Sequence, residues 1–205
     1  KVMRNKLLLI AVLLGGLSSL WARENKLMNA GFEEGTVKTK REGVENGEWY
    51  KNNLPNSSIM PVVNVAYEGD KSLRFVCNDR IDTRYKNFVA QKGLQLSRKK
   101  IKVSFYARSA KPVILNVSFV GFAEGKGNKS IAGRGENVNI TGDNDWHLYT
   151  VEVDLGSGKI VSDKKTHSLN FDEPFELRIA VDGGQDFSRA KSVFYIDNIS
   201  VNEKV

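Results

Sequence analysis

The amino-acid sequence predicts an all-β protein, folded as a jelly-roll β-sandwich of two antiparallel sheets in a single domain. From residue 23 onward, no stretch keeps helical periodicity for more than about two turns, whereas alternating, β-branched and aromatic runs recur between turn signals. The run Ile101–Arg108 alternates strictly, with Val103, Phe105 and Ala107 on its apolar face. Such a strand is typical of an antiparallel sheet with one solvated face, and not of the doubly buried sheet of an α/β fold.

Further runs of the same kind provide enough strands for two packed sheets. In chain order, the predicted strands are Leu27–Glu33, Glu48–Lys51, Met60–Tyr67, Ser72–Cys77, Phe88–Leu94, Ile101–Arg108, Val113–Phe122, Trp146–Asp154, Phe175–Val181 and Val193–Val201. Residues 121–142 are rich in glycine and are predicted to form a long mobile loop or a loose hairpin. Residues 156–170 are predicted to form a second surface excursion.

The first 22 residues have the pattern of a secretory signal peptide. Arg4 and Lys6 form a basic region, residues 7–14 an apolar region, and Trp21-Ala22 a small-residue ending suited to cleavage. We therefore assign residues 1–22 to a signal peptide and residues 23–205 to one β-sandwich domain.

The predicted location is outside the cytoplasm. The apolar run is shorter than the roughly 20 residues of a spanning helix, so we expect no membrane span in the mature chain; a permanent anchor is the alternative. No lipobox cysteine lies near the cleavage point, and the only cysteine, Cys77, cannot form an internal disulfide. We expect an exported protein that is periplasmic, cell-surface or extracellular.

The basic charge does not indicate a nucleic-acid partner. Removing residues 1–22 removes Lys1, Arg4 and Lys6 and no acids, so the formal net charge falls from +7 to +4. The other lysines and arginines are scattered, without a basic stripe interleaved with aromatics. We therefore expect no nucleic-acid binding.

Three short motifs, at the two ends and in the first half of the mature chain, carry a resemblance to a known family. They are LMNAGFEEG at 27–35, EGDKSLRF at 68–75 and FYIDNISV at 194–201. Together with VSFYAR at 103–108 and WHLY at 146–149, they resemble the family 4, 9 and 22 type of secreted carbohydrate-binding module, a galactose-binding-domain-like jelly roll. The resemblance spans residues 27–201. It implies that the first and last strands are neighbours.

The resemblance also implies a structural calcium ion that ties these strands to the turn before the Ser-Leu strand. Carried over by position, Glu33, Glu68 and Asp197 would supply side-chain oxygens, and carbonyls near Gly31 and Lys71 would complete the shell. Calcium prefers six to eight oxygen ligands in a flexible arrangement. The alternative is that the three acids are solvated strand ends.

In this family, one sheet offers a groove in which rings stack on sugar faces and polar side chains bond hydroxyl groups, and aromatic rings with amides suit that chemistry. We expect the binding residues on solvent-facing strand positions or on loops over the groove. The main candidate is Tyr106; the full set is Tyr106, Arg108, Asn116, Ser118, Gln91 and Arg178 on strands, and Trp49, Tyr50 and Tyr85 on or near loops. The few aromatics and the charges of Lys102 and Arg108 beside Tyr106 leave acidic or host-type glycans, or no glycan, open.

Catalysis is not expected. His147 and His167 have no ligand-spaced partner and no nucleophile motif beside them. The acidic pairs Asp143/Asp145 and Asp172/Glu173 lie in turn-like sequence rather than on one strand. The predicted function is a secreted, non-catalytic protein that binds oligo- or polysaccharide, with cell-surface glycan-handling proteins as further partners. A protein-binding adhesion or assembly sandwich and a glycoside hydrolase-like enzyme are the alternatives.

Overall fold

A computed structural model describes residues 25–39, 43–83, 86–125, 130–133, 135–156, 158–159 and 166–204. The predicted signal peptide and Tyr85 lie outside these residues. In the described ranges, no helix is long and apolar enough to cross a membrane.

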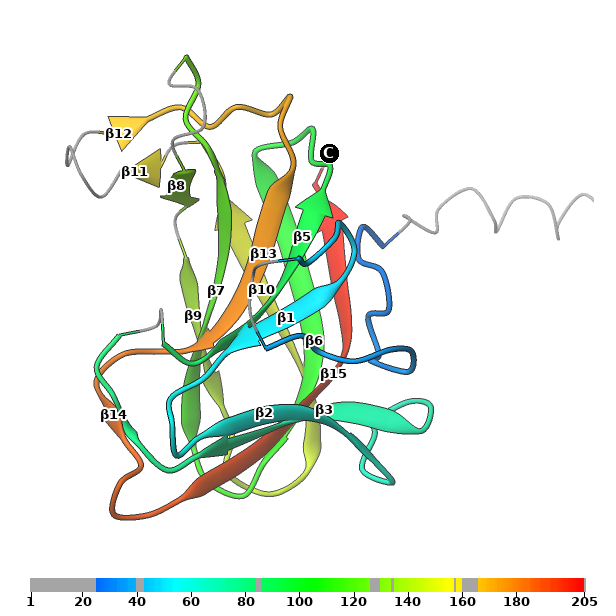
Figure 1. Ribbon diagram of the computed structural model, residues 1–205, viewed down its shortest axis with the longest axis vertical. Coiled ribbons are helices and arrows are strands. Elements are labelled where there is room, and N and C mark those ends of the chain that lie inside the picture. Colours follow the sequence, from blue (N-terminus) through cyan, green and yellow to red (C-terminus); the bar gives the residue numbers. More distant parts are fainter. Residues whose placement is uncertain are drawn as a thin grey trace, which may run out of the picture.

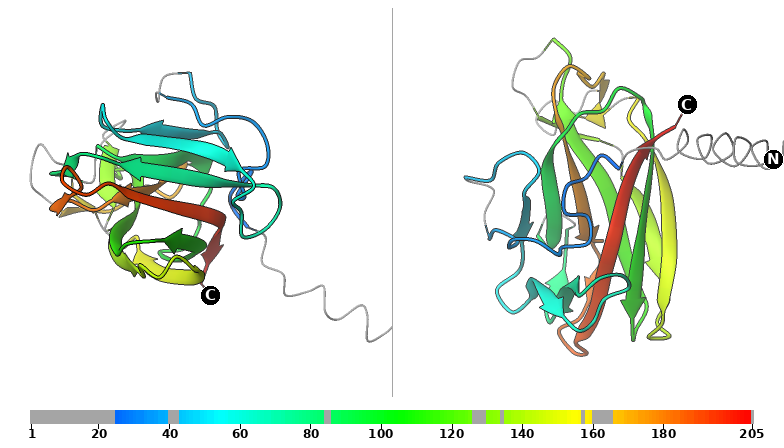
Figure 2. Two further views of the ribbon diagram at one scale, coloured as in Figure 1. Left: turned by 90° about the horizontal axis from the view of Figure 1, so that it is seen from below. Right: turned by 90° about the vertical axis from the view of Figure 1, so that its right-hand side faces the viewer.

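The described chain forms two antiparallel sheets that face each other, with a small third sheet at one end (Figures 1 and 2). The large sheet has the order β1 (Trp49–Asn52), β5 (Phe88–Leu94), β13 (Phe175–Val181), β7 (Val113–Phe122), β8 (Ser130–Gly133), β11 (Gly158–Lys159), β12 (Thr166–His167), and β9 (Glu136–Ile140) also pairs with β7. The five-stranded sheet has the order β10 (Trp146–Asp154), β6 (Lys100–Ser109), β15 (Ser192–Glu203), β3 (Lys71–Cys77), β2 (Ser58–Val63). The small sheet pairs β4 (Arg80–Ile81) with β14 (Gln185–Asp186).

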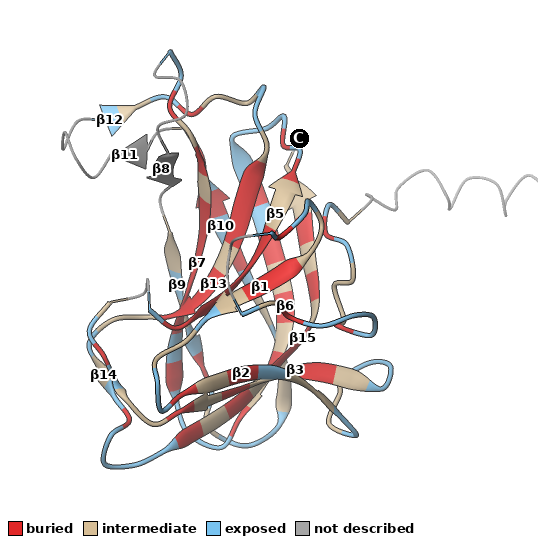
Figure 3. Ribbon diagram, in the orientation of Figure 1, coloured by how far each residue is buried: buried red, intermediate tan, exposed pale blue. Residues whose placement is uncertain are grey.

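One hydrophobic core fills the space between the two sheets. Phe105 and Ile196 enter it from the five-stranded sheet, and Val117 and Ile179 enter it from the large sheet. Figure 3 shows buried and exposed positions alternating along strands of both sheets. This alternation is what two packed antiparallel sheets require, and it confirms the predicted β-sandwich.

The strands with clear alternation or continuous apolar runs are confirmed. The bounds of β5, β7, β10 and β13 are the predicted ones, and β6 and β15 extend the predicted strands by one or two residues at each end. β2 begins two residues earlier than predicted and ends at Val63, because Asn64 has a φ of 63° and turns the chain.

The predicted strand Leu27–Glu33 is wrong. Asn29 and Phe32 have φ values of 47° and 60°, which are incompatible with a strand, and the segment forms turns instead. It still lies along β15, since Lys26 N–H donates to the Val201 carbonyl and Ile199 N–H donates to the Ala30 carbonyl. The expectation that the two ends of the mature chain are neighbours is therefore confirmed.

The predicted long connections contain additional strands. β8 and β9 lie within 121–142 and both pair with β7, while β11 and β12 lie within 156–170. Sequence reasoning missed them because glycine and asparagine break the apolar alternation there. β8 and β9 pair with the edge of β7, and β11 extends the sheet from β8 to β12.

Cys77 is a core residue rather than a reactive thiol. It is fully buried, and the Asn87 side-chain amide donates to its sulfur over 3.2 Å. Burial raises the pKa of Cys77 to about 12, so the thiol stays protonated and unreactive at neutral pH.

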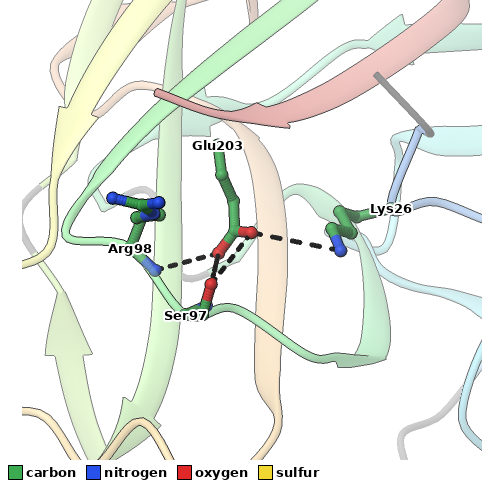
Figure 4. A network of polar contacts seen from close by, with 4 residues as sticks. All are labelled: Lys26, Ser97, Arg98 and Glu203. Atoms are coloured by element: carbon green, nitrogen blue, oxygen red, sulfur yellow. Dashed lines mark hydrogen bonds and ion pairs between the residues drawn. The ribbon is translucent and has the colours of Figure 1, made fainter. Parts of the chain in front are cut away.

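The carboxylate of Glu203 joins three segments at the end of β15 (Figure 4). It accepts hydrogen bonds from the backbone N–H groups of Ser97 and Arg98 and lies 4.0 Å from the Lys26 ammonium group. Burial acts to raise the pKa of Glu203, but the Ser97 and Arg98 N–H groups outweigh it and lower the pKa below its usual value.

The substitution Glu203→Gln should therefore lower the free energy of unfolding by about 1–2 kcal/mol at neutral pH, because two amides lose a charged acceptor. Since the folded-state pKa is lowered, this stabilisation is present above the usual glutamate pKa and disappears as the pH falls through the folded-state value. Urea unfolding at several pH values measures the difference from wild type. Glu152→Gln, an exposed ion-paired glutamate on β10, is the control and should leave stability unchanged. Equal stability of Glu203→Gln and wild type at neutral pH would refute the assignment.

Candidate functional site

An aromatic cluster covers part of the outer face of the five-stranded sheet. The rings of Tyr67 and Tyr106 stack with centroids 3.4 Å apart and an interplanar angle of 11°. The Trp146 ring lies 6.2 Å from Tyr67 and 6.5 Å from Tyr195. The four rings come from β6, β10, β15 and the β2–β3 loop, so residues distant in sequence form one surface.

The strand register places one arginine between two of these rings and a second arginine beside Tyr195. Trp146 on β10 lies opposite Arg108 on β6, which lies opposite Tyr195 on β15. On the other side, Tyr195 lies opposite Arg74 on β3. We name the six residues Tyr67, Tyr106, Trp146, Tyr195, Arg74 and Arg108 the aromatic surface.

The aromatic surface is accessible to a ligand. Tyr67 is 45% exposed, and Leu148, opposite Tyr106 on β10, is 57% exposed. Tyr106, Trp146, Tyr195 and both arginines are partly exposed. Exposed rings beside hydrogen-bonding side chains are the usual chemistry of a binding surface for a ligand with both apolar and polar faces.

The position of Tyr67 depends on Asp197. A bulge in β15 adds one residue between Asp197 and Ser200, and Asn198 in the bulge has a φ of 46°. The Asp197 carboxylate is 0% exposed and accepts hydrogen bonds from the N–H groups of Tyr67 (2.7 Å), Glu68 (3.1 Å) and Asn198 (2.7 Å). The β2–β3 loop is thus fixed above Tyr106.

Glu33 holds the other side of the same loop. Its carboxylate accepts hydrogen bonds from the N–H groups of Asp70 and Lys71 at 3.1–3.3 Å. Gly69 has a φ of 73°, and a Cβ atom there would lie 2.3 Å from Glu33 Oε1. Only glycine allows this approach.

The structure brings together the positions expected for calcium, but each carboxylate already has hydrogen-bond donors. Glu68 accepts a hydrogen bond of 2.6 Å from the Asn198 side chain, while Asp197 and Glu33 both lie near Gly31. Burial, and to a lesser extent the negative charge of Glu33, raises the pKa of Asp197 against the effect of its N–H donors. Among the described residues, no three acidic, histidine or cysteine side chains form a group that could hold a metal ion.

The other strand candidates do not lie on the aromatic surface. Asn116, Ser118 and Arg178 lie on the outer face of the large sheet, on the opposite side of the core. Arg178 pairs with Glu176 at 2.5 Å and lies 4.8 Å above the Phe88 ring. The prediction of one groove containing both Tyr106 and Arg178 is therefore wrong, since the two side chains point away from opposite sheets.

Three further candidates are buried. Gln91 is 1% exposed, and its side-chain amide exchanges two hydrogen bonds with the backbone of Met28. Trp49 packs against Phe32 and donates its indole N–H to the Met28 and Asn29 carbonyls. Tyr50 is also buried, so the expectation that these side chains face solvent or overhang a groove is wrong. Tyr85 lies outside the described residues.

Sequence reasoning missed Tyr67, Trp146, Tyr195 and Arg74 as site residues. Tyr195 and Arg74 are immediate sequence neighbours of the buried Ile196 and Phe75, so alternation assigns them to the outer face. Tyr67 gave no such signal, because the predicted strand Met60–Tyr67 ends at Val63 and Tyr67 lies in the loop that follows.

Comparison with known proteins supports the fold. No family model and no curated protein matches the sequence. A protein from Bacteroides thetaiotaomicron, provisionally described as sugar-binding, has 15% identity and a TM-score of 0.68, covering 88% of this chain and 100% of its own. A family 4 carbohydrate-binding module has 17% identity and a TM-score of 0.54, with 87% and 99% covered. A xylan-binding family 22 domain from Paenibacillus barcinonensis has 12% identity and a TM-score of 0.52, with 90% and 98% covered. The fold is that of jelly-roll carbohydrate-binding modules, as the motifs predicted.

The substitution Asp197→Asn should lower the free energy of unfolding by about 1–3 kcal/mol, because an amide nitrogen replaces an oxygen that accepts backbone N–H bonds. It should also change the near-ultraviolet circular dichroism, since Tyr67 is no longer held on Tyr106. Asp70→Asn, an exposed aspartate in the same loop, is the control. A stable variant with an unchanged spectrum would show that Asp197 does not fix the loop.

Proposed function

We propose that this protein is a non-catalytic glycan-binding protein that binds an oligo- or polysaccharide through the aromatic surface. The observation that carries the proposal is the exposed Tyr67 ring, stacked on Tyr106 and flanked by Trp146 and Tyr195. One face of a pyranose ring carries C–H groups, which pack against an aromatic ring without requiring charge.

Rigidity supports the same function. Tyr67 is ordered before any ligand arrives, because Asp197 binds its backbone and Tyr106 supports its ring. A hydrogen bond with the Tyr106 side chain also raises the pKa of Tyr67, so the Tyr67 hydroxyl group stays neutral at neutral pH. Binding to a prearranged surface avoids part of the entropy cost of ordering side chains.

The similar structures support the proposal at the level of class. All three reported neighbours are described by carbohydrate binding, and none is described as a catalytic domain. We further propose that residues 1–22 direct export and that the protein acts outside the cytoplasm, where it would present glycan to cell-surface partners.

Truncation of the aromatic rings tests both the glycan-binding function and the position of the binding site on the protein. A glycan array should identify ligands for the mature protein, and Tyr67→Ala and Trp146→Ala should each weaken binding by about tenfold or more, because a buried sugar face loses its ring. Isothermal titration calorimetry measures the affinities. Ile114→Ala, which removes an exposed apolar side chain from the large sheet, is the control.

Two results would contradict the proposal in different ways. No binding to any plant, microbial or host glycan would remove the function. Loss of binding in Arg178→Gln but not in Tyr67→Ala would place the ligand on the large sheet instead.

We also propose a structural calcium ion beside Asp197 and Glu33, with Glu68 and the carbonyls of Gly31 and Lys71 as further ligands. Because the three carboxylates do not form a ready metal group among the described residues, the ion would have to draw them together. The support is that two carboxylates lie near Gly31 and that the pKa of Asp197 is raised, which a nearby cation would reverse. The ion would stabilise the β2–β3 loop and would not contact the sugar.

Calcium at about 100 times its dissociation constant would add about 2.7 kcal/mol, and each kcal/mol raises the melting temperature by about 2–4 °C in a domain of this size. We expect melting to shift upward with calcium at neutral pH and not at acidic pH, where protonated carboxylates no longer bind a cation. Glu33→Gln should reduce the shift. Identical melting with calcium and with chelator would remove all five ligand assignments.

A further inference from the structure

The aromatic surface contains two arginines placed at a regular spacing. Arg108 and Arg74 lie directly opposite Tyr195, one on each neighbouring strand. Because adjacent strands are about 4.8 Å apart, the two arginine backbones are about 10 Å apart, with the tyrosine ring between them. Trp146 and Met60 continue the same row on the two outer strands.

Neither arginine has a carboxylate partner among the described residues. Arg108 Nε donates to the Asn144 carbonyl over 2.7 Å, and Arg74 Nη2 lies 3.5 Å from the Met60 sulfur, which is a weak acceptor. Arg74 Nε is buried and has no hydrogen-bond partner. By contrast, Arg178 on the large sheet is neutralised by Glu176.

The acidic residues at the rim of the surface do not replace that missing partner. Asp197 is buried under Tyr67 and is held by three backbone N–H groups, and Glu68 is held by the Asn198 side chain. A buried or half-buried guanidinium nitrogen without an acceptor is energetically costly. Arg74 and Arg108 are partly exposed, so an anion supplied by a ligand can pair with the accessible part of each guanidinium group, whose planar shape matches a carboxylate or a sulfate.

We propose that the glycan bound here is acidic, and that its anionic substituents pair with Arg108 and Arg74 while its sugar faces pack on Trp146, Tyr195 and Tyr67. This inference rests on the proposed function and narrows its substrate class to polysaccharides with a carboxylate or sulfate group. The bound glycan would run across the strands, because the row of rings and arginines crosses β10, β6, β15 and β3.

The test compares glycans that differ only in charge. Polygalacturonate oligomers are compared with their fully methyl-esterified forms, and chondroitin sulfate with unsulfated chondroitin, by calorimetry on the mature protein at low and high salt. We expect at least one anionic glycan to bind, its esterified or unsulfated form to bind more weakly, and added salt to weaken the interaction. The first pair reports a carboxylate and the second a sulfate.

Arg108→Gln should weaken binding of the anionic glycan by about 10- to 100-fold. Arg74→Lys retains a charge but not the planar fork, and should weaken it by a smaller factor. Lys102→Gln is the matched control, because it removes one positive charge from the same face of β6, away from the rings. Circular dichroism checks that each variant is folded.

The possible results separate the two proposals. Equal binding of polygalacturonate and its neutral methyl ester, or of chondroitin sulfate and chondroitin, that is also unaffected by Arg108→Gln overturns the acidic-glycan inference and leaves glycan binding intact. Equal losses in Arg108→Gln and Lys102→Gln show only general charge attraction, and also overturn the inference. Absence of binding to any glycan overturns both.

Discussion

The buried carboxylate of Asp197 is the interaction on which the rest of the aromatic surface depends. Its three backbone hydrogen bonds fix the bulge in β15 and the β2–β3 loop against each other. Without them, Tyr67 would belong to a free hairpin loop, and the remaining rings would lie separately on three strands. One charged side chain therefore converts a flat sheet face into a surface with a raised, oriented ring.

This arrangement requires unusual local geometry from several distant residues. Asn198 adopts a positive φ in the bulge, Gly69 leaves room for Glu33, and the turns at Asn29 and Phe32 bring Glu33 beside the loop. A positive φ is unfavourable for a non-glycine residue, and it persists only where the surroundings determine it. Several such residues lie around Asp197. Holding the loop in place therefore costs conformational stability, and the large core shared by the two sheets offsets that cost.

The sequence predicted the fold well because the core strands follow simple physical rules. Strict alternation in β6 and the apolar runs of β5, β7 and β13 determine their structure locally.

The site was predicted less well, because the alternation of a strand shows which side chains face outward but not which sheet the strand joins. Alternation shows that Tyr106 and Arg178 both face outward, but it does not show that their strands belong to different sheets. That information lies in the strand order, where β6 neighbours β15 and β13 neighbours β7. Gln91 was misassigned because it lies on the inner face of β5, opposite the core residues Trp49 and Leu177, where its side-chain amide bonds the Met28 backbone.

The two outer faces show how one fold provides different chemistry. On the large sheet, Arg178 is paired with Glu176, and Asn116 donates to Asn137, so much of the polar capacity is used within the protein. On the five-stranded sheet, Arg108 lies between Trp146 and Tyr195 and Arg74 lies beside Tyr195, and both have only weak or neutral partners among the described residues. Stability alone would favour pairing these guanidinium groups with carboxylates or replacing them with smaller polar residues. The combination of exposed rings with arginines that lack carboxylate partners is the feature that supports the proposed extended ligand with apolar faces and negative charges.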